Sequence, residues 1–328
     1  MAFVSLQDIR DAQARIRAVA RITPLLDVSG VAGRPLWLKC ESLQPGGAFK
    51  IRGAYNMVAQ LSDSQRGRGV ITYSSGNHGQ AVAIAARALG APALVVMPTT
   101  APKIKVEGAR GFGAEVVFAG TTSLHRRAKA EALAAERGFT MVPPFDHEWI
   151  IAGQGTLGLE ILEQCPNAAT ILVPIGGGGL ISGVAAAIKQ TRDGVTVVGV
   201  EPAGAASMKN AIDAGEVRTL DGARSVADGL MAVRPGDLTF AHVRRYVDRL
   251  VTVDDDAIVA AVRWLFERAH IVAEPSGAAT VAAALAADAQ YTPPVVAIVS
   301  GGNLDPADLV KYVEVGDRGL GRADRGKT

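Results

Sequence analysis

The stretch Thr170–Gly183, TILVPIGGGGLISG, decides how the rest of the chain is interpreted. An apolar run, Thr170–Pro174, leads into four consecutive glycines, and Leu180–Gln190 then predicts a helix. The glycines are Gly176, Gly177, Gly178 and Gly179. Backbone N–H groups at a helix N-terminus attract anions, and residues without a Cβ let a phosphate come close to the backbone. The stretch therefore predicts a buried strand, an anion-binding loop and a helix.

Three alternative roles for the four glycines fit the sequence less well. A flexible turn without a ligand is disfavoured, because ordering four glycines loses much backbone entropy. A dinucleotide fold is suggested by Glu201, which ends the next predicted strand about 20 residues further on. Its G-x-G-x-x-G pattern fails, since the last position falls on Ile181 or Ser182, and a P-loop fails because Val184 stands where lysine is needed. The loop is best suited to a single phosphate.

Working outward, short β-branched runs alternate with longer Ala-rich stretches. The predicted strands are Gly69–Tyr73, Ala93–Met97, Ala114–Phe118, Thr170–Pro174, Val195–Val200 and Val295–Val299. The predicted helices are Leu6–Val19, Gly79–Leu89, Leu124–Arg137, Gln154–Gln164, Leu180–Gln190, Asp255–Ala269 and Gly277–Ala287. This alternation predicts an α/β protein with parallel sheets flanked by helices.

Composition limits the class of protein. A length of 328 residues suggests about two domains. A net charge of +2 argues against nucleic acid as a partner. Cys40 and Cys165 are too few and too far apart for a disulfide scaffold or a cysteine zinc site. No run approaches the roughly 18 apolar residues of a membrane span, and the first residues lack a signal peptide's apolar stretch. We expect a soluble cytoplasmic protein that does not bind membranes.

Two further strand ends carry polar groups. Val70–Gln80, VITYSSGNHGQ, ends in hydroxyl, amide and imidazole side chains before a predicted helix. These groups could cap the helix or hold a substrate carboxylate, since both tasks use the same donors. His78 alone would more often be structural, but so many donors together favour a site. Ser300, in AIVSGGN, is uninformative by itself.

Lys50 lies in an apolar, glycine-rich segment, Gly46–Asn56, GGAFKIRGAYN. A desolvated lysine has a lowered pKa and can act as a nucleophile that forms a Schiff base. The ordinary alternative is a surface lysine at the start of a helix.

Several other chemistries find no pattern here. The sequence has no G-x-S-x-G nucleophile elbow. His147–Glu148 has no second histidine four residues on, as an H-E-x-x-H zinc site requires. Asp254–Asp256 stands at the start of a predicted helix, where the dipole favours acidic residues without any metal.

Taken together, these segments resemble the fold-type II pyridoxal-phosphate enzymes (the tryptophan synthase β-like fold), and within them the serine/threonine dehydratase and serine racemase family. The matching pieces, in chain order, are GGAFKIRGA, SSGNHGQ, IAGQGT, PIGGGGL, GVEP, ADGL, EPSGAA and SGGN. They extend over nearly the whole chain. The resemblance implies pyridoxal 5'-phosphate as cofactor and an amino acid as substrate.

The resemblance also implies a role for each site residue. Lys50 would hold the cofactor as a Schiff base, with Phe49 packed beside the ring. Gly176–Gly179 would bind the phosphate, Asn77 the phenolic oxygen and Ser300 the pyridine nitrogen. The substrate carboxylate would be bound by Ser74, Ser75, Gly76, Asn77 and His78.

The family architecture implies a large cofactor-binding domain, 1–68 plus 147–315, a small domain, 69–146, and a flexible tail, 316–328. It also implies a homodimer. Only 28 residues follow Ser300, so we expect no C-terminal effector-binding domain and no feedback inhibition by isoleucine.

The function implied is β-elimination. L-threonine or L-serine would yield 2-oxobutyrate or pyruvate plus ammonia, with the Lys50 amine removing the Cα proton. Ser300 is a neutral partner for the pyridine nitrogen, which limits carbanion delocalisation and favours elimination over transamination.

Two departures from the family pattern bear on this function. Many threonine dehydratases carry alanine where this chain has Ser75, and serine there resembles the racemase and hydroxyaspartate dehydratase branch. Serine racemase with side dehydratase activity is therefore the alternative. The racemase cation site resembles Glu201 and the backbone oxygen of Ala205, but Ser207 replaces its second acid, which leaves at most a weakly bound Mg²⁺ or Ca²⁺.

The remaining alternatives have less support. Leu124 aligns with an arginine that would hold a second substrate carboxylate, so hydroxyaspartate would be a poor substrate, although Arg126 and Arg127 lie close by. A catalytically idle protein that binds pyridoxal phosphate or an amino acid is disfavoured by the intact Lys50, Asn77 and Ser300. A dinucleotide-dependent oxidoreductase is disfavoured by the glycine pattern.

Overall fold

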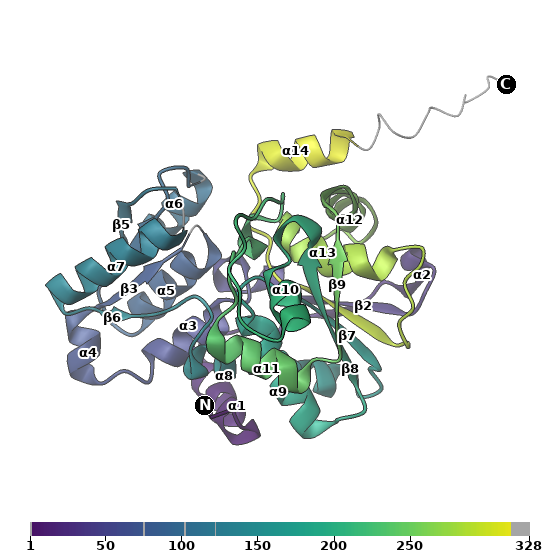
Figure 1. Cartoon of the computed structure of the whole chain (residues 1–328), viewed down its shortest axis with the longest axis horizontal. Helices are drawn as coiled ribbons and strands as arrows, with labels where there is room; N and C mark the ends of the chain where they lie inside the picture. Colours follow the sequence, from purple (N-terminus) through teal and green to yellow (C-terminus); the bar gives the residue numbers. More distant parts are fainter. Residues whose placement is uncertain (1, 75, 102, 122, 316–328) are drawn as a thin grey trace.

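The computed structural model describes residues 2–74, 76–101, 103–121 and 123–315, without the side chains of residues 123, 124 and 315. The predicted tail, 316–328, lies outside this part of the chain. Figure 1 shows two α/β units beside each other. The four-stranded unit, on the left, contains β3–β6 and α4–α7, and the six-stranded unit contains the other strands.

The six-stranded sheet has the order β1-β2-β10-β7-β8-β9. Its strands are β1 (Leu25–Asp27), β2 (Leu36–Cys40), β7 (Thr170–Pro174), β8 (Thr196–Pro202), β9 (Arg249–Val253) and β10 (Val295–Val299). β1 pairs antiparallel with β2, and every other pair is parallel. β10 runs beside β2 from Val295 opposite Leu36 to Val299 opposite Cys40, which brings the ends of these distant strands together.

The four-stranded sheet has the order β5-β4-β3-β6, and all its pairs are parallel. Its strands are β3 (Val70–Tyr73), β4 (Ala93–Met97), β5 (Glu115–Phe118) and β6 (Thr140–Met141). Alternation along β4 sends Leu94 and Val96 toward α7, whereas Val95 and Met97 pack with α5 and α6. Both faces are thus covered, as parallel sheets require.

The helices cover both sheets. The α-helices are α1 (Leu6–Ile16), α2 (Ser29–Ala32), α3 (Ile51–Val58), α4 (Asp63–Arg68), α5 (Asn77–Ala88), α6 (Lys103–Gly111), α7 (Ser123–Arg137), α8 (Glu148–Gln164), α9 (Gly179–Thr191), α10 (Ser207–Ala214), α11 (Asp237–Tyr246), α12 (Asp255–Arg268), α13 (Pro275–Leu285) and α14 (Pro306–Val315). The short 3-10 helices are η1 (Glu41–Leu43), η2 (Pro45–Gly47), η3 (Ala203–Ala205) and η4 (Asp228–Leu230). On the six-stranded sheet, α12 and α13 pack on one face and α8 and α9 on the other.

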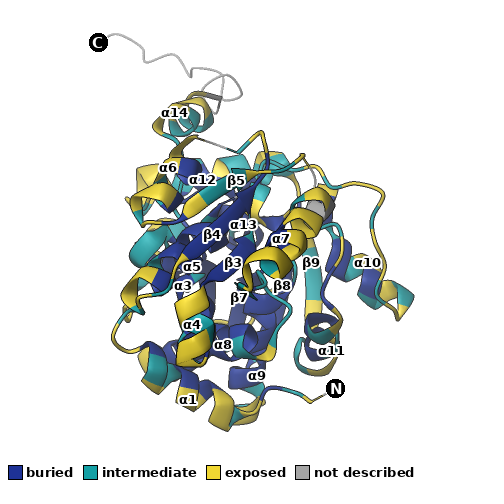
Figure 2. Cartoon of the chain, turned by 90° about the vertical axis from the view of Figure 1, so that its left-hand side faces the viewer, coloured by how far each residue is buried: buried dark blue, intermediate teal, exposed yellow. Residues whose placement is uncertain are grey.

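Burial follows from this layering. Figure 2 shows the central strands and α8 largely buried, with exposed residues on the outer sides of α1, α4 and α7. Helix α3 packs against both α5 and α8, so it lies between the two units. Across the described ranges, no helix combines the length and apolarity needed to span a membrane.

The predicted α/β class with parallel sheets is confirmed. All six predicted strands form, three of them with the predicted bounds, and all seven predicted helices form. The sequence patterns missed β1, β2, β6 and β9. These strands are short, carry charge or alternate weakly, as in β2, where Lys39 interrupts the apolar run.

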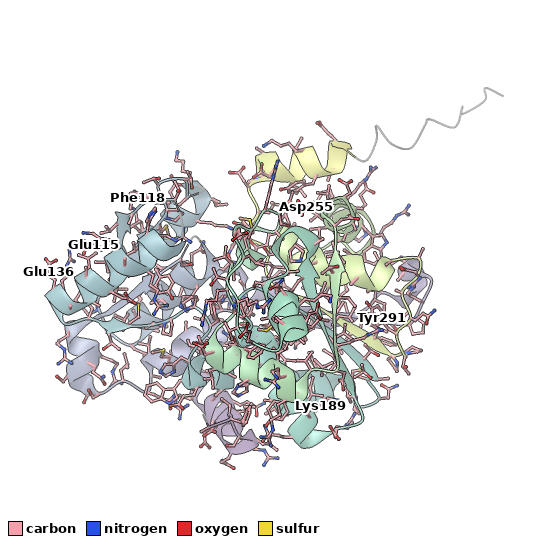
Figure 3. The ribbon with its side chains drawn as sticks, in the orientation of Figure 1. Glu115, Phe118, Glu136, Lys189, Asp255 and Tyr291 are labelled. Carbon is pink, nitrogen blue, oxygen red and sulfur yellow. The ribbon has the colours of Figure 1, made fainter. Side chains whose placement is uncertain are left out.

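Two of the acidic residues at the start of α12 have different partners. Asp254 is the N-cap and accepts a hydrogen bond from Ala257 N at 2.7 Å. Asp255, labelled in Figure 3 at the margin of the six-stranded unit, accepts bonds from Ser225 Oγ at 2.5 Å and Val226 N at 3.1 Å. Asp254 thus satisfies a free N–H group of the helix, whereas Asp255 joins the helix to the segment before η4.

Candidate functional site

Four polar or glycine-rich segments come together near the carboxyl ends of strands from the two units. They follow β3, β7, β10 and η2. Ala48 forms an isolated antiparallel bridge with Gly301, and Phe49 N donates to Ser300 O at 3.1 Å. The segment that carries Lys50 is therefore joined by backbone hydrogen bonds to the end of β10. Ligands of parallel sheets bind at such strand ends.

Lys50 stands immediately before α3, in the region between the units. Its Nζ donates to Pro144 O at 2.8 Å and lies 5.1 Å from the centroid of the Phe49 ring. Burial lowers the pKa of Lys50 from 10.5 to about 8. A larger fraction of its amine is therefore neutral at physiological pH than for an exposed lysine, which makes it a competent nucleophile or base.

The four glycines between β7 and α9 leave no room for side chains. Gly178 is the N-cap of α9 and has a φ of +94°, a conformation that favours glycine. A Cβ on Gly176 would lie 3.1 Å from Gly229 O, and one on Gly179 would lie 2.9 Å from Phe145 Cβ. The bare backbone at the positive end of α9 forms a cradle suited to a phosphate.

Two residues that the sequence did not single out hold this loop. Thr239 Oγ1 donates to Gly177 O at 2.7 Å. Asp146 accepts hydrogen bonds from Asp237 N, Leu238 N and Thr239 N at 3.0–3.1 Å, and so caps α11 from a distant segment. Their contacts connect positions that are 62 to 93 residues apart. No local sequence pattern could therefore have identified Thr239 and Asp146.

Asn77, the first residue of α5, is bound on both sides of its amide. Its Oδ1 accepts from Asn303 Nδ2 at 2.9 Å, and its Nδ2 donates to Glu274 Oε1. Asn303 Nδ2 also donates to Gly46 O at 2.7 Å. The segments before Lys50, after β10 and before α13 therefore converge on Asn77. Asn303 and Glu274 belong to the SGGN and EPSGAA segments, which were the signal that could have identified them.

Ser300 follows β10 and is buried. Its Oγ donates to Ser276 O at 3.3 Å, and Ser276 Oγ accepts from Gly229 N at 2.9 Å. A neutral hydroxyl thus occupies the end of this strand, close in space to the Lys50 segment.

The segment after β3 brings its polar groups to the N-terminus of α5. Ser74 is half-buried, and its Oγ accepts from Gly76 N at 3.1 Å. Ser75 lies outside the described residues. His78 is buried, with Nε2 donating to Val142 O at 3.1 Å, and its Nδ1 has no hydrogen-bond partner among the described residues.

Burial, together with the nearby Lys50, lowers the pKa of His78 from 6.5 to about 3. The His78 side chain is therefore neutral at physiological pH and supplies no positive charge for a carboxylate. Donors available there are the Ser74 hydroxyl and the first N–H groups of α5, which have no acceptor within the helix.

A charged cluster lies beside Asn77 and was not expected from the sequence. Lys105 Nζ is 2.5 Å from Asp228 Oδ2 and 3.7 Å from Glu274 Oε2. Burial raises the pKa of Glu274 to about 7, although Lys105 acts to lower it. Lys105 sits in a charged, surface-like sequence, KIKVEGARG, so no local signal marked it.

Glu201 lies near the end of β8, and Ala205 and Ser207 follow that strand. Both oxygens of Glu201 accept backbone N–H bonds, from Met208 and Lys209, at 2.8 Å each. Burial raises the pKa of Glu201 to about 7. Ala205 ends η3, and Ser207 Oγ is buried without a partner in the described part of the chain. Within that part, no three His, Cys, Asp or Glu side chains are grouped to hold a metal ion.

The two arginines near Leu124, Arg126 and Arg127, differ in exposure and in their partners. The Leu124 side chain lies outside the described part of the structure. Arg126 is half-buried, and its Nη1 donates to Thr121 O at 3.3 Å. Arg127 is exposed and pairs with Glu131 at 2.8 Å.

Comparisons with known proteins agree with this geometry. A sequence model of the family described as "Pyridoxal-phosphate dependent enzyme" matches residues 16–301. The chain is 42% identical to the L-threonine ammonia-lyase of Thermotoga maritima, over 95% of this chain and 79% of that protein. It is 41% identical to a serine racemase of Oryza sativa, over 92% of this chain and 91% of that protein. The structure of maize serine racemase superposes with a TM-score of 0.90 at 39% identity, covering 97% of this chain and 99% of that one.

Proposed function

Because the chain belongs to the family of pyridoxal-phosphate dependent enzymes, we propose that it is an L-threonine/L-serine ammonia-lyase. It converts L-threonine to 2-oxobutyrate, or L-serine to pyruvate, with release of ammonia. The observation that carries the proposal is Lys50, an amine with a lowered pKa held where the glycine cradle, Asn77 and Ser300 converge.

The residues at the site fit pyridoxal phosphate. Gly176–Gly179 would hold its phosphate, since their bare backbone lies at the positive end of α9, where Gly178 is the N-cap. Lys50 would hold the aldehyde carbon, Asn77 the phenolic oxygen and Ser300 the ring nitrogen. When bound, the cofactor serves as an electron sink for the bonds at the substrate Cα.

Lys50 is the base that we assign to the Cα proton of the substrate. Its pKa of about 8 leaves part of the amine neutral at physiological pH, and Pro144 O orients Nζ. A base with a pKa near the working pH combines a useful neutral fraction with sufficient basicity. Phe49 covers one side of the amine and limits its hydration.

The substrate carboxylate is assigned to the N-terminus of α5. Ser74 Oγ and the first N–H groups of this helix supply neutral donors, and the helix dipole adds attraction for an anion. His78 is neutral and buried, so it packs beside the site and adds no positive charge for the carboxylate. Neutral recognition of one carboxylate suits small amino acids such as serine and threonine.

Serine racemase with side dehydratase activity is the second candidate. It is favoured by the presence of Ser75, because the resemblance to the racemase branch implies that this hydroxyl transfers a proton. The similarity to serine racemases of rice and maize supports racemisation. The similarity to the ammonia-lyase supports elimination about equally, because the identities are close. A hydroxyaspartate dehydratase and a catalytically idle binding protein have no comparable support.

The test is a substrate panel on the purified holoenzyme, with keto acid, ammonia and serine enantiomers measured together. We expect keto acid from L-threonine and L-serine, and loss of both the turnover and the cofactor's bound-state absorbance in Lys50→Ala. Ser75→Ala should retain L-threonine elimination and lose action on D-serine. Serine that equilibrates between enantiomers with little pyruvate would assign the racemase instead, and an active Lys50→Ala would overturn both.

We also propose the division into a large domain, 1–68 plus 147–315, and a small domain, 69–146, which the two separate sheets support. A homodimer, a cytoplasmic location and a weakly bound divalent cation at Glu201 and Ala205 O stay predictions. The backbone N–H bonds already made by Glu201 favour a structural role for this carboxylate, capping α10.

A further inference from the structure

Lys105 is a buried lysine that joins the two units beside the site. It lies on α6, which packs against α5 and β5 of the four-stranded unit. Its Nζ reaches Asp228 in η4 at 2.5 Å and Glu274, the N-cap of α13, at 3.7 Å. Only 6% of its side chain is exposed, whereas the side chain of Lys103 on the same helix is 87% exposed. Both partners of Lys105 belong to the six-stranded unit, so the ion pairs cross from one unit to the other.

The side chain also covers the substrate-binding segment. A Cβ on Gly76 would lie 2.6 Å from Lys105 Cδ and 3.2 Å from its Nζ, so Lys105 is packed directly on Gly76. Glu274 uses its other oxygen to accept the hydrogen bond from Asn77 Nδ2. Lys105 therefore contacts Gly76, which is assigned to the substrate. It is linked through Glu274 to Asn77, which is assigned to the cofactor.

Charge balance explains why this position needs a cation. Only 3% of the Glu274 side chain is exposed, and its Oε2 has no hydrogen-bond partner among the described residues. Removing one partner of a buried ion pair leaves an uncompensated charge, and this costs more than the pair itself contributes. Lys105, from the four-stranded unit, supplies the positive charge that lets Asp228 and Glu274 of the six-stranded unit lie near each other.

We propose that Lys105 is a positioning residue, which clamps the four-stranded unit against the six-stranded unit and holds Glu274 in the orientation that fixes Asn77. This inference rests on the proposed function, since it takes Asn77 and Gly76 as the contacts of cofactor and substrate. Lys105 itself acts through these residues and need not touch the reacting atoms.

The clamp should affect how kcat/KM depends on pH, because Lys105 acts on the protonation of Glu274. The charged or polar groups facing Glu274 are Lys105 from α6, Asp228 from η4 and Asn77 from α5. Burial raises the pKa of Glu274, and Lys105 lowers it. Without Lys105, the neighbouring Asp228 is left as the charged group facing Glu274, so the pKa of Glu274 rises further. If ionised Glu274 orients Asn77, the acidic limb of kcat/KM moves to higher pH, by about one pH unit or more.

The experiment compares three variants of the holoenzyme: Lys105→Met, Lys105→Arg and Lys103→Met. The last is the matched control, because Lys103 lies on the same helix and its exposed side chain pairs with Glu107 at 3.6 Å. We expect Lys105→Met to raise KM by about tenfold or more, to change kcat less, and to shift the acidic limb upward. It should also release the cofactor faster on dialysis. Lys105→Arg should recover most of each effect, and Lys103→Met should match the wild type.

A fourth variant separates the clamp from a general loss of folding. Asp228→Asn removes charge at a site whose side chain is 35% exposed, so the chain should fold normally and show a smaller rise in KM. Unchanged KM, pH profile and cofactor release in both Lys105→Met and Asp228→Asn would overturn the clamp. If the wild type deaminates neither serine nor threonine, the proposed function is wrong. The clamp is still tested in that case, because cofactor release from the variants can be measured without turnover.

Discussion

Arg52 Nη1 lies 2.6 Å from Glu160 Oε1, and this buried ion pair joins the second residue after Lys50 to α8. Arg52 Nε also donates to Glu41 Oε2 at 2.7 Å, and Lys39 Nζ donates to Glu160 Oε2 at 2.8 Å. Two cations and two carboxylates therefore balance each other inside the six-stranded unit. The network fixes the start of α3, and with it the position of the Lys50 backbone.

Replacing Arg52 by methionine should destabilise the fold strongly. Glu41 and part of Glu160 would be left buried without their cation, which costs about 3–5 kcal/mol in the free energy of unfolding. Urea denaturation of the purified variant measures this loss. Arg127→Met is the control, since Arg127 pairs with Glu131 at the surface and should change stability by less than about 1 kcal/mol. Equal stabilities for the two variants would contradict the role assigned to the network.

Alanine at Gly179 should weaken binding of pyridoxal phosphate. The new Cβ would lie 2.9 Å from Phe145 Cβ and 3.0 Å from Phe145 Cα, so the backbone of the cradle must shift. We expect a rise in the cofactor Kd of about tenfold or more, because phosphate contacts depend on backbone placement. A titration of the apoenzyme followed by absorbance measures it. Gly194→Ala, where nothing lies within 4 Å of the added carbon, should bind as the wild type does.

His78 should remain neutral over the whole physiological range. Its folded-state pKa of about 3 lies below the unperturbed 6.5, so the folded chain binds fewer protons than the unfolded chain between these values. The resulting stability is present above about pH 6.5 and is lost as pH falls toward 3. NMR of ¹⁵N-histidine protein should show the Nε2–H tautomer for His78, without titration between about pH 5 and 8. A His78 resonance that titrates near its unperturbed pKa would contradict the geometry.

Both cysteines should be unreactive in the folded protein. Burial raises the pKa of Cys40 to about 12 and also raises that of Cys165, and the thiolate is the reactive form. A chromogenic disulfide reagent at about pH 8 should therefore modify both thiols only after unfolding in denaturant. Rapid modification of Cys40 in the native protein would show that β2 opens, since Cys40 is fully buried in that strand.

Local patterns were sufficient for much of the sheet. Ala93–Met97, Thr170–Pro174 and Val295–Val299 form strands with the predicted bounds, because each is an apolar run closed by turn residues. The four glycines likewise connect a strand to a helix as expected, with Gly178 as the N-cap of α9. Strand β2 was missed because Lys39 interrupts its apolar pattern, and the Glu160 that compensates this charge is 121 positions away.

The sequence by itself determined the α/β class, the chain order of the main strands and helices, and the segments that carry Lys50, the glycine cradle, Asn77 and Ser300. Only the tertiary structure decided which charges are buried and paired. Lys105 looks like a surface residue until Asp228 and Glu274 are brought to it from the other unit. The physical reason is that apolar periodicity is a local property of the chain, whereas the cost of burying a charge depends on partners supplied by distant segments.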